Sequence, residues 1–396
     1  MGAVFTIAVL ASSGCGSESV AAAENPVDLS KLNVGSYSSR PQDRVFKDPA
    51  RTARTMEALR LGNIMPLPQE VDPSLRYHSS FTHPFVDVES FAGDPVFGYF
   101  NITDFSANTA GLVAGFSTSG QSNDDSYIAT ELTDAVMIFD TADAAGSAAT
   151  ALARSGFDNR FGTNDSTEPA QSTQYPTAHL SWIPKYQELA SWYATGQFVI
   201  ITLVSDQANS ALKVSDQASL RALSDKAITV TADRLKSFQP TFPDKLASLP
   251  TDPQGMLRLT LPLPTGDNTA YPFDGTLDRH GALHKVDDPD RAPARFEKAG
   301  VDFVSYGAGR LVRTRDAAAA QTYVDEISID RFQQRVDPPP GLPTARCSKY
   351  YERRPFVPNF HCYVAYQRYA IEIWSDQQQD LYQRISAQYA ILANSK

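Results

Sequence analysis

The pattern of apolar and polar residues repeats once along the chain. Tyr193–Gln207 aligns without a gap onto Tyr363–Gln377, and the two stretches share a Tyr, a Gln, an Ile and a closing Ser-Asp-Gln. Each stretch has a continuous apolar run that ends in polar residues, which predicts a buried strand followed by a turn. Apolar residues at helical spacing after each copy predict an amphipathic closing helix. Self-similarity of this kind indicates two related units.

A weaker similarity lies upstream of each copy, in the same order. Val136–Phe139 leads into an Ala-rich stretch at Asp143, and Leu311-Val312 leads into another at Asp316. Asp is favoured at helix N-termini, so we expect Asp143 and Asp316 to cap the helices that follow. Each half then reads as strand, helix, hairpin and closing helix. This order predicts an α+β fold of two tandem related domains, each a mainly antiparallel sheet with helices packed on one face.

A turn-rich segment separates the two halves. Leu249–Gly255 contains Pro, Asp and Gly, and the alternating leucines of Leu257–Leu263 predict a strand that opens the second domain. We therefore assign residues 31–250 to an N-terminal domain and residues 251–396 to a C-terminal domain, which suits a chain of 396 residues. Residues 28–100, rich in Pro, Tyr and Phe, predict an irregular, mostly extended region packed on the first domain.

The first residues resemble a bacterial lipoprotein signal. A short apolar stretch, Val4–Leu10, is followed by small residues and then by Cys15. This stretch is too short to span a bilayer. The resemblance implies that residues 1–14 are a signal sequence and that Cys15 carries a lipid anchor. Residues 15–30 would then be a flexible linker, because they are rich in Gly, Ser, Ala and Glu. A free cysteine on an N-terminal tail is the alternative.

The two remaining cysteines, Cys347 and Cys362, form an even pair in a compartment expected to be oxidising. A disulfide between them would tie the base of a hairpin and stabilise the fold by about 3 kcal/mol in the chain-entropy model. The ungapped repeat aligns Cys362 with Trp192, so a large buried indole would take the place of the disulfide in the first copy. A metal site is the alternative, but only His361 lies beside the pair.

Composition excludes several classes of function. Hydrophobic residues make up 42% and charged residues 20% of the chain, as in ordinary globular proteins. The net charge of −10 argues against a surface for nucleic acid or anionic lipid, since both require a basic face. The 17 tyrosines would suit a pocket for a sugar or a lipid chain, and they would equally suit two ordinary cores.

No sequence motif for catalysis or metal binding is complete. Gly115–Gly120 has one residue too many between its first Ser and second Gly to be a nucleophile elbow. His280 and His284 could bind a metal from one helical face, but they flank a glycine before an Asp-Pro turn. We interpret Asp287–Asp290 as a solvated turn rather than a calcium loop, and His179 as a packed side chain. We therefore predict no catalytic residue, no cofactor and no metal.

Short motifs along nearly the whole chain resemble a family of uncharacterised, two-domain lipoproteins of actinobacterial cell envelopes, grouped as a domain of unknown function. The residues that carry the resemblance are Glu57–Gly62, Pro66–Pro68, Val71–Pro73, Asp252–Leu257, Leu261-Pro262, Cys347, Cys362 and Ala387–Tyr389. The resemblance implies a location in the cell envelope and transfers no catalytic residue.

Together these patterns predict a non-enzymatic lipoprotein on the extracytoplasmic face of the cell membrane, held there through Cys15. Its folded part would bind a small lipid or sugar ligand, or serve as a scaffold for an envelope protein. Two alternatives remain open. One is an envelope hydrolase whose site has no recognised motif, and the other is a regulatory partner of another envelope protein.

Overall fold

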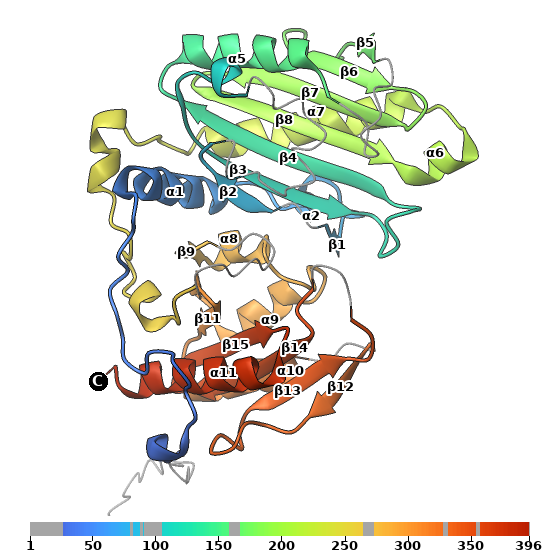
Figure 1. Ribbon diagram of the computed structural model, residues 1–396. Helices are drawn as coiled ribbons and strands as arrows, with labels where there is room; N and C mark the ends of the chain where they lie inside the picture. The colour runs from blue at the N-terminus through green and yellow to red at the C-terminus, as the bar shows by residue number, and fades with distance from the viewer. Residues whose placement is uncertain are drawn as a thin grey trace, which may run out of the picture.

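The computed structural model describes residues 27–79, 82–87, 90, 105–157, 167–263, 273–327, 332–353 and 357–395. Cys15 and the predicted signal sequence lie outside the described residues. Two antiparallel sheets, one above the other in Figure 1, carry the fold. The chain is therefore an α+β protein of two tandem domains, as its sequence predicts.

Eight strands form the first sheet, in the order β1-β3-β4-β8-β7-β6-β5, with β2 also paired to β3. They are β1 (Tyr77–His78), β2 (His83–Phe85), β3 (Leu112–Gln121), β4 (Thr130–Phe139), β5 (Glu168–Ala170), β6 (His179–Ile183), β7 (Glu188–Thr195) and β8 (Phe198–Asp206). Seven strands form the second sheet, in the order β12-β13-β14-β15-β11-β10-β9. They are β9 (Gly275–Asp278), β10 (Phe303–Tyr306), β11 (Gly309–Arg313), β12 (Gln333–Val336), β13 (Arg346–Tyr350), β14 (Phe360–Tyr366) and β15 (Tyr369–Ser375).

The two sheets have one topology when the second is read backwards. The run β3-β4-β8-β7-β6 of the first sheet corresponds to β10-β11-β15-β14-β13 of the second. Helix α5 (Ala142–Ser155) follows β4 as α10 (Ala317–Glu326) follows β11. Helices α7 (Gln217–Leu235) and α11 (Gln378–Ala393) follow β8 and β15 and close the two domains. The shared order of strands and helices confirms that the domains are related.

The register of the predicted repeat is wrong by one residue. The aligned stretch contains a hairpin rather than one strand: Thr195 pairs with Phe198 in the first domain, and Tyr366 pairs with Tyr369 in the second. Counted from these closing pairs, Cys362 corresponds to Ser191 and not to Trp192. Side chains alternate between the faces of a strand, so a slip of one residue moves every side chain to the opposite face.

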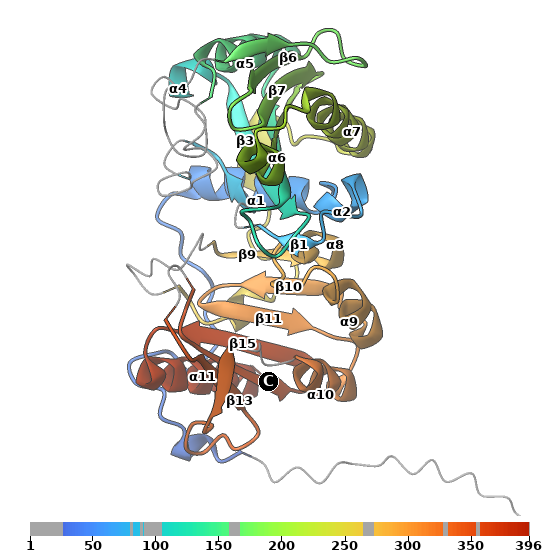
Figure 2. The same cartoon turned by 90° about the vertical axis from the view of Figure 1, so that its right-hand side faces the viewer.

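Helices cover both faces of each sheet, contrary to the predicted single face. In β4, Met137 packs into one core with Ala148 of α5, whereas its neighbour Ile138 packs on the other side with Ile228 of α7. Figure 2 shows α5 and α7 on opposite sides of the strands of the first sheet. The sequence carries the reason, because a continuous apolar run is typical of a strand buried on both faces.

The helix caps are only partly as predicted. Asp316 caps α10 by accepting a hydrogen bond from the backbone N–H of Ala319 at 2.8 Å. At the start of α5 the cap is Thr141, whose hydroxyl accepts from the N–H of Ala144 at 3.1 Å, and Asp143 lies within the first turn. Thr141 and Asp316 are therefore the corresponding residues, since each is the N-cap of its helix. A hydroxyl oxygen and a carboxylate oxygen can both accept the capping hydrogen bond.

Helix α1 (Pro49–Gly62) lies between the two sheets and joins their cores (Figure 1). Its Leu59 packs with Leu277 and the other core residues of the second domain, while Leu61 packs with Phe116 of the first. The other described helical segments are η1 (Leu29–Lys31), α2 (Pro68–Val71), α4 (Phe105–Asn108), α6 (Gln207–Leu212), η3 (Pro243–Ser248), η4 (Leu257–Leu259), α8 (Arg279–Leu283) and α9 (Ala292–Ala299). The strand expected at Leu257 is thus a short 3-10 helix.

The segment before α1 packs on the second domain, although we expected residues 31–250 to form the first. Leu32 lies in one buried cluster with Leu342 and Leu381. The Tyr37 hydroxyl donates to the Asp380 carboxylate of α11 at 2.5 Å. Contacts between distant parts of the chain place this segment, and no local pattern encodes them. Within the described residues, no helix combines the length and apolarity needed to cross a bilayer.

Candidate ligand-binding site

The two related domains differ in chemistry beneath α5 and α10. In the first sheet, Ala135 pairs with Ile201, which pairs with Trp192. The same three positions of the second sheet, counted from the hairpin turns, are Arg310, Glu372 and Tyr363. Two pairs further from the turn, Leu203 and Ala190 are replaced by Trp374 and His361. An apolar core in one domain is therefore a charged and aromatic cluster in the other.

The first domain shows what the fold itself requires at these positions. All five of its residues are buried, and the most exposed, Leu203, retains only 8% of its surface. They pack with Ala145 and Leu152 of α5 in a single hydrophobic core. We call the corresponding set in the second domain the Arg310 site, which comprises Arg310, Asn359, His361, Tyr363, Glu372 and Trp374. Asn359, which lies just before β14 and two residues before His361, is included because its Oδ1 atom is buried without a hydrogen-bond partner.

Arg310 is the electrostatic centre of the site. Its guanidinium contacts the carboxylates of Glu372 at 3.2 Å and Asp287 at 3.0 Å, and it lies over the Trp374 ring at 5.3 Å from the centroid. Burial alone would lower the pKa of Arg310, but Asp287 and Glu372 outweigh it and hold that pKa well above its usual value. Burial, followed by the charge of Glu372, raises the pKa of Tyr363 well above 10. Arg310 is thus a permanent cation and Tyr363 a neutral phenol.

The helix over the site and the burial of the site's side chains differ from those of the first domain. α10 has 10 residues, whereas the corresponding α5 has 14. The Arg346 side chain donates to the Val324 carbonyl near the end of α10 at 3.2 Å, which fixes where the helix stops over the sheet. Trp374, Tyr363 and His361 remain half-buried, whereas their counterparts in the first domain are buried. The second domain thus differs from the first both in the length of this helix and in the partial exposure of these three side chains.

Three polar atoms of the site are buried without a hydrogen-bond partner: Nε of Arg310, Nδ1 of His361 and Oδ1 of Asn359. Burial lowers the pKa of His361, so its ring is neutral at physiological pH. His361 Nε2 lies 3.0 Å from the Pro358 carbonyl, which can only accept, so Nε2 carries the proton and Nδ1 is an acceptor. The site therefore offers one donor and two acceptors, and a buried polar atom without a partner calls for an explanation.

The predicted disulfide between Cys347 and Cys362 is present. The two cysteines are directly opposite each other in β13 and β14, on the α11 face of the sheet. Cys362 lies between His361 and Tyr363 in the sequence, so the bond staples the strand that carries both side chains. The alternative of a metal site has no support, because the described residues contain no group of three or more candidate ligands.

His280 and His284 lie at the junction of the domains. The rings are 5.7 Å apart between centroids. His284 contacts Thr118 Oγ1 through Nδ1 at 2.8 Å and the Met65 carbonyl through Nε2 at 3.1 Å. His280 Nε2 lies 3.1 Å from Glu70, whose pKa is lowered to about 2: burial opposes the shift, and the hydrogen bonds from His280 and the Leu67 backbone outweigh it. These histidines join the second domain to the first.

Burial lowers the pKa of His284 to about 3, from a usual value near 6.5. The folded protein therefore binds fewer protons than the unfolded chain between these two values, and stability falls as the pH falls below 6.5. We expect His284→Gln, which places an uncharged amide where the ring was, to remove this pH dependence. The free energy of unfolding of the variant should then fall less steeply with falling pH in this range, by up to about 1.4 kcal/mol per pH unit. Urea denaturation at several pH values measures the slope, and identical slopes for the two proteins would contradict the expectation.

Other residues singled out from the sequence play no part in the Arg310 site, except Asp287. Gly115–Gly120 lies within β3, where Ser117 and Ser119 are buried, so it is not a nucleophile elbow. His179 is exposed at the start of β6, so the packed environment we expected is wrong. Asp287 lies in the solvated turn predicted for Asp287–Asp290, and it is also the exposed partner of Arg310.

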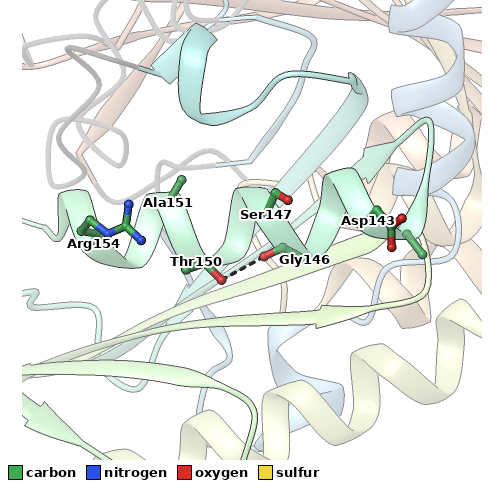
Figure 3. A pocket seen from close by; sticks show the side chains of 7 residues that line it. Asp143, Gly146, Ser147, Thr150, Ala151 and Arg154 are labelled. Carbon is green, nitrogen blue, oxygen red and sulfur yellow. Dashed lines mark hydrogen bonds between the residues drawn. The ribbon is translucent and has the colours of Figure 1, made fainter.

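A hollow of about 620 Å³ lies on the surface of α5 and is shown in Figure 3. Small and polar side chains of the helix line it, namely Ala142, Asp143, Gly146, Ser147, Thr150, Ala151 and Arg154. The Thr150 hydroxyl donates to the Gly146 carbonyl of its own helix at 3.0 Å. The hollow is a shallow exposed helix face, and it has none of the buried unpaired atoms found at the Arg310 site.

Family comparison covers both domains. Residues 47–251 match the family described as domain of unknown function (DUF7373) N-terminal, and residues 256–395 match its C-terminal counterpart. The chain belongs to this two-domain family. No curated protein matches it. Among solved structures, the extracellular domain of PknH from Mycobacterium tuberculosis is similar at 13% identity and a TM-score of 0.28, over 46% of this chain and 97% of that one.

Proposed function

We propose that the protein is a non-enzymatic binding protein of an actinobacterial cell envelope, anchored to the outside of the cell membrane and holding its ligand at the Arg310 site. One observation carries the proposal: the same positions of one duplicated fold are apolar in the first domain and charged or aromatic in the second. A buried ion pair is often no more stabilising than apolar residues of similar volume. The fold therefore does not need the polar set, and ligand binding explains it.

The chemistry of the site supports binding rather than catalysis. The carboxylate of Glu372 is engaged in an ion pair with Arg310 at 3.2 Å. The six described residues of the site include no serine, threonine or thiol to act as a nucleophile, and Cys347 and Cys362 are bonded to each other. A hydrolase needs a nucleophile or an activated water beside a base. The described site instead offers fixed hydrogen-bonding atoms and aromatic surface.

The N-terminal tether would join the folded part of the protein at the second domain. Val27, the first described residue, packs on the same cluster as Leu32 and Leu381. The short chain from Cys15 to Val27 spans at most about 40 Å when fully extended. A lipid on Cys15 would therefore keep the domain that carries the Arg310 site close to the membrane. The disulfide supports an extracytoplasmic location, since such bonds persist in oxidising compartments.

The proposal predicts that protein isolated from its own host carries a ligand. Native mass spectrometry of the intact protein should show an added mass that is lost in the double variant Arg310→Ala, Glu372→Ile. This variant gives the site the residues of the first domain, Ala135 and Ile201, so its fold should be retained. Circular dichroism checks the fold. If the double variant keeps the same added mass, the ligand lies elsewhere and the proposed site is wrong.

Anchoring has a separate test. Replacing Cys15 by Ala should move the protein from the membrane fraction to the soluble fraction, because the lipid would have no thiol to bind. Ser13→Ala is the matched control, since it keeps a small residue before Cys15 and should leave the protein in the membrane. Cell fractionation followed by immunoblotting measures both. Retention of Cys15→Ala in the membrane at the control level would contradict the anchor.

A further inference from the structure

We infer that the Arg310 site binds the neutral ring of a saccharide. The inference rests on the proposed binding function and adds the chemical class of the ligand. Three features of the site bear on that class: its charge, the directions in which its free polar atoms donate and accept, and its aromatic surface.

The charge of the site disfavours anions. Arg310 is its one cation, and two carboxylates, those of Glu372 and Asp287, already contact it. Glu372 is 9% exposed, so solvent screens its charge poorly. His361 adds no positive charge, because burial lowers its pKa. A phosphate, fatty acid or uronic acid would therefore meet a net negative site whose one cation already contacts two carboxylates, whereas a neutral ligand meets no such barrier.

The free polar atoms match hydroxyl groups. Arg310 Nε can only donate, whereas His361 Nδ1 and Asn359 Oδ1 can only accept in the state described above. A hydroxyl group both donates and accepts, so the hydroxyls of a saccharide can pair with free atoms of either kind. An ammonium group only donates and leaves Arg310 Nε unpaired. An aliphatic chain leaves all three unpaired, at a cost of about 1–3 kcal/mol for each buried group.

Aromatic surface completes the site. Trp374 and Tyr363 are half-buried on the same face of the sheet as His361, because Trp374 pairs with His361 and Tyr363 lies two residues further along β14. Arg310 against the indole fixes the plane of Trp374. A flat ring with an apolar face and polar edges suits the C–H face of a sugar, which stacks while its hydroxyls bond at the rim. Leu203, the counterpart of Trp374, offers no such ring.

Tryptophan fluorescence provides a direct test, because the chain has three tryptophans and only Trp374 is half-buried. The intact protein is titrated with linear oligomers of glucose, mannose, galactose and N-acetylglucosamine, alongside galacturonic acid oligomers and palmitate. We expect at least one neutral oligomer to shift the emission and to release heat in calorimetry. Trp374→Phe should abolish the shift and weaken the calorimetric affinity by about tenfold, whereas Trp182→Phe in the first domain should leave both intact.

Asn359→Ala should weaken binding of the same oligomer without changing the melting temperature, since the Asn359 amide oxygen has no internal partner. Saturable binding of palmitate or of the acidic oligomer alone, lost in Arg310→Ala, Glu372→Ile, would overturn the neutral-saccharide class and leave the proposed binding function standing. A copurifying non-saccharide ligand that depends on the site would do the same. If no probe binds and the protein from its host carries no ligand, both the saccharide class and the binding function are overturned.

Discussion

Arg310→Ala is expected to lower the free energy of unfolding by about 3–5 kcal/mol, because it leaves a buried carboxylate without its partner. Glu372 lies 3.2 Å from the guanidinium and is 9% exposed. The unpaired carboxylate of Asp287 should contribute less to this loss, since it is 72% exposed and water can solvate it. Urea denaturation, followed by the fluorescence of Trp374 beside Arg310, measures the change.

The double variant Arg310→Ala, Glu372→Ile separates the cost of a stranded charge from the value of the pair. Removing both charges takes away the unpaired carboxylate, so we expect most of the lost stability to return. The first domain shows that Ala135 and Ile201 pack well in these positions. A double variant as unstable as the single one would mean that the ion pair itself stabilises the fold, and that the loss in Arg310→Ala does not come from an unpaired carboxylate. The fold would then require the Arg310 site, and the argument for a ligand would lose its main support.

Much of the fold could be predicted because the relevant signals are local. The turn-rich segment between the halves, the Ala-rich helices and the closing helices all follow from short sequence patterns. Asp316 caps its helix as expected, and the even cysteine pair is bonded. The number of domains and their α+β class depend only on such patterns.

The register and the layers needed information that identical residues do not supply. Tyr193 and Tyr363 match in the ungapped alignment, yet the first packs near α7 and the second near α10, on opposite faces. In strands buried on both sides, apolar residues are interchangeable in sequence, so identities do not fix which face a residue takes. The continuous apolar run Val136–Phe139 indicates a strand covered on both faces, and the prediction of helices on one face does not use this signal.

The Arg310 site was missed because its parts are distant in sequence. Arg310 and Glu372 are 62 residues apart, and only the adjacency of β11 and β15 brings them together. Glu372 nevertheless leaves a local sign, because it is the one charged residue of β15 and lies between Ile371 and Ile373. Arg310 precedes Leu311-Val312 in β11, a strand that also contains Arg313. A charge at a position that alternation places in the core requires a partner. Searching for two such charges of opposite sign would have suggested the pair.

Replacing both Cys347 and Cys362 by Ser should lower the free energy of unfolding of the second domain by about 3 kcal/mol, because the unfolded chain regains the freedom of a loop closed over 15 residues. The first domain contains no cysteine and is the internal control. Trp182 and Trp192 report its unfolding, and Trp374 reports that of the second domain. A reductant added to the wild type should reproduce the loss in the second domain alone.

The same change should reach the Arg310 site. Cys362 lies between His361 and Tyr363 in β14, so the disulfide limits how far that strand can move from β13. Without the disulfide we expect the affinity for the ligand to fall. Ser191→Ala is the matched control, because Ser191 is the corresponding residue of the first domain and its hydroxyl forms a hydrogen bond with that of Thr202 at 2.6 Å. This control should reduce the affinity less. Calorimetric titration compares the two variants below their melting temperatures. Equal affinities would show that the staple serves stability alone, whereas a selective loss would mean that the covalent bond also holds the binding strand in place.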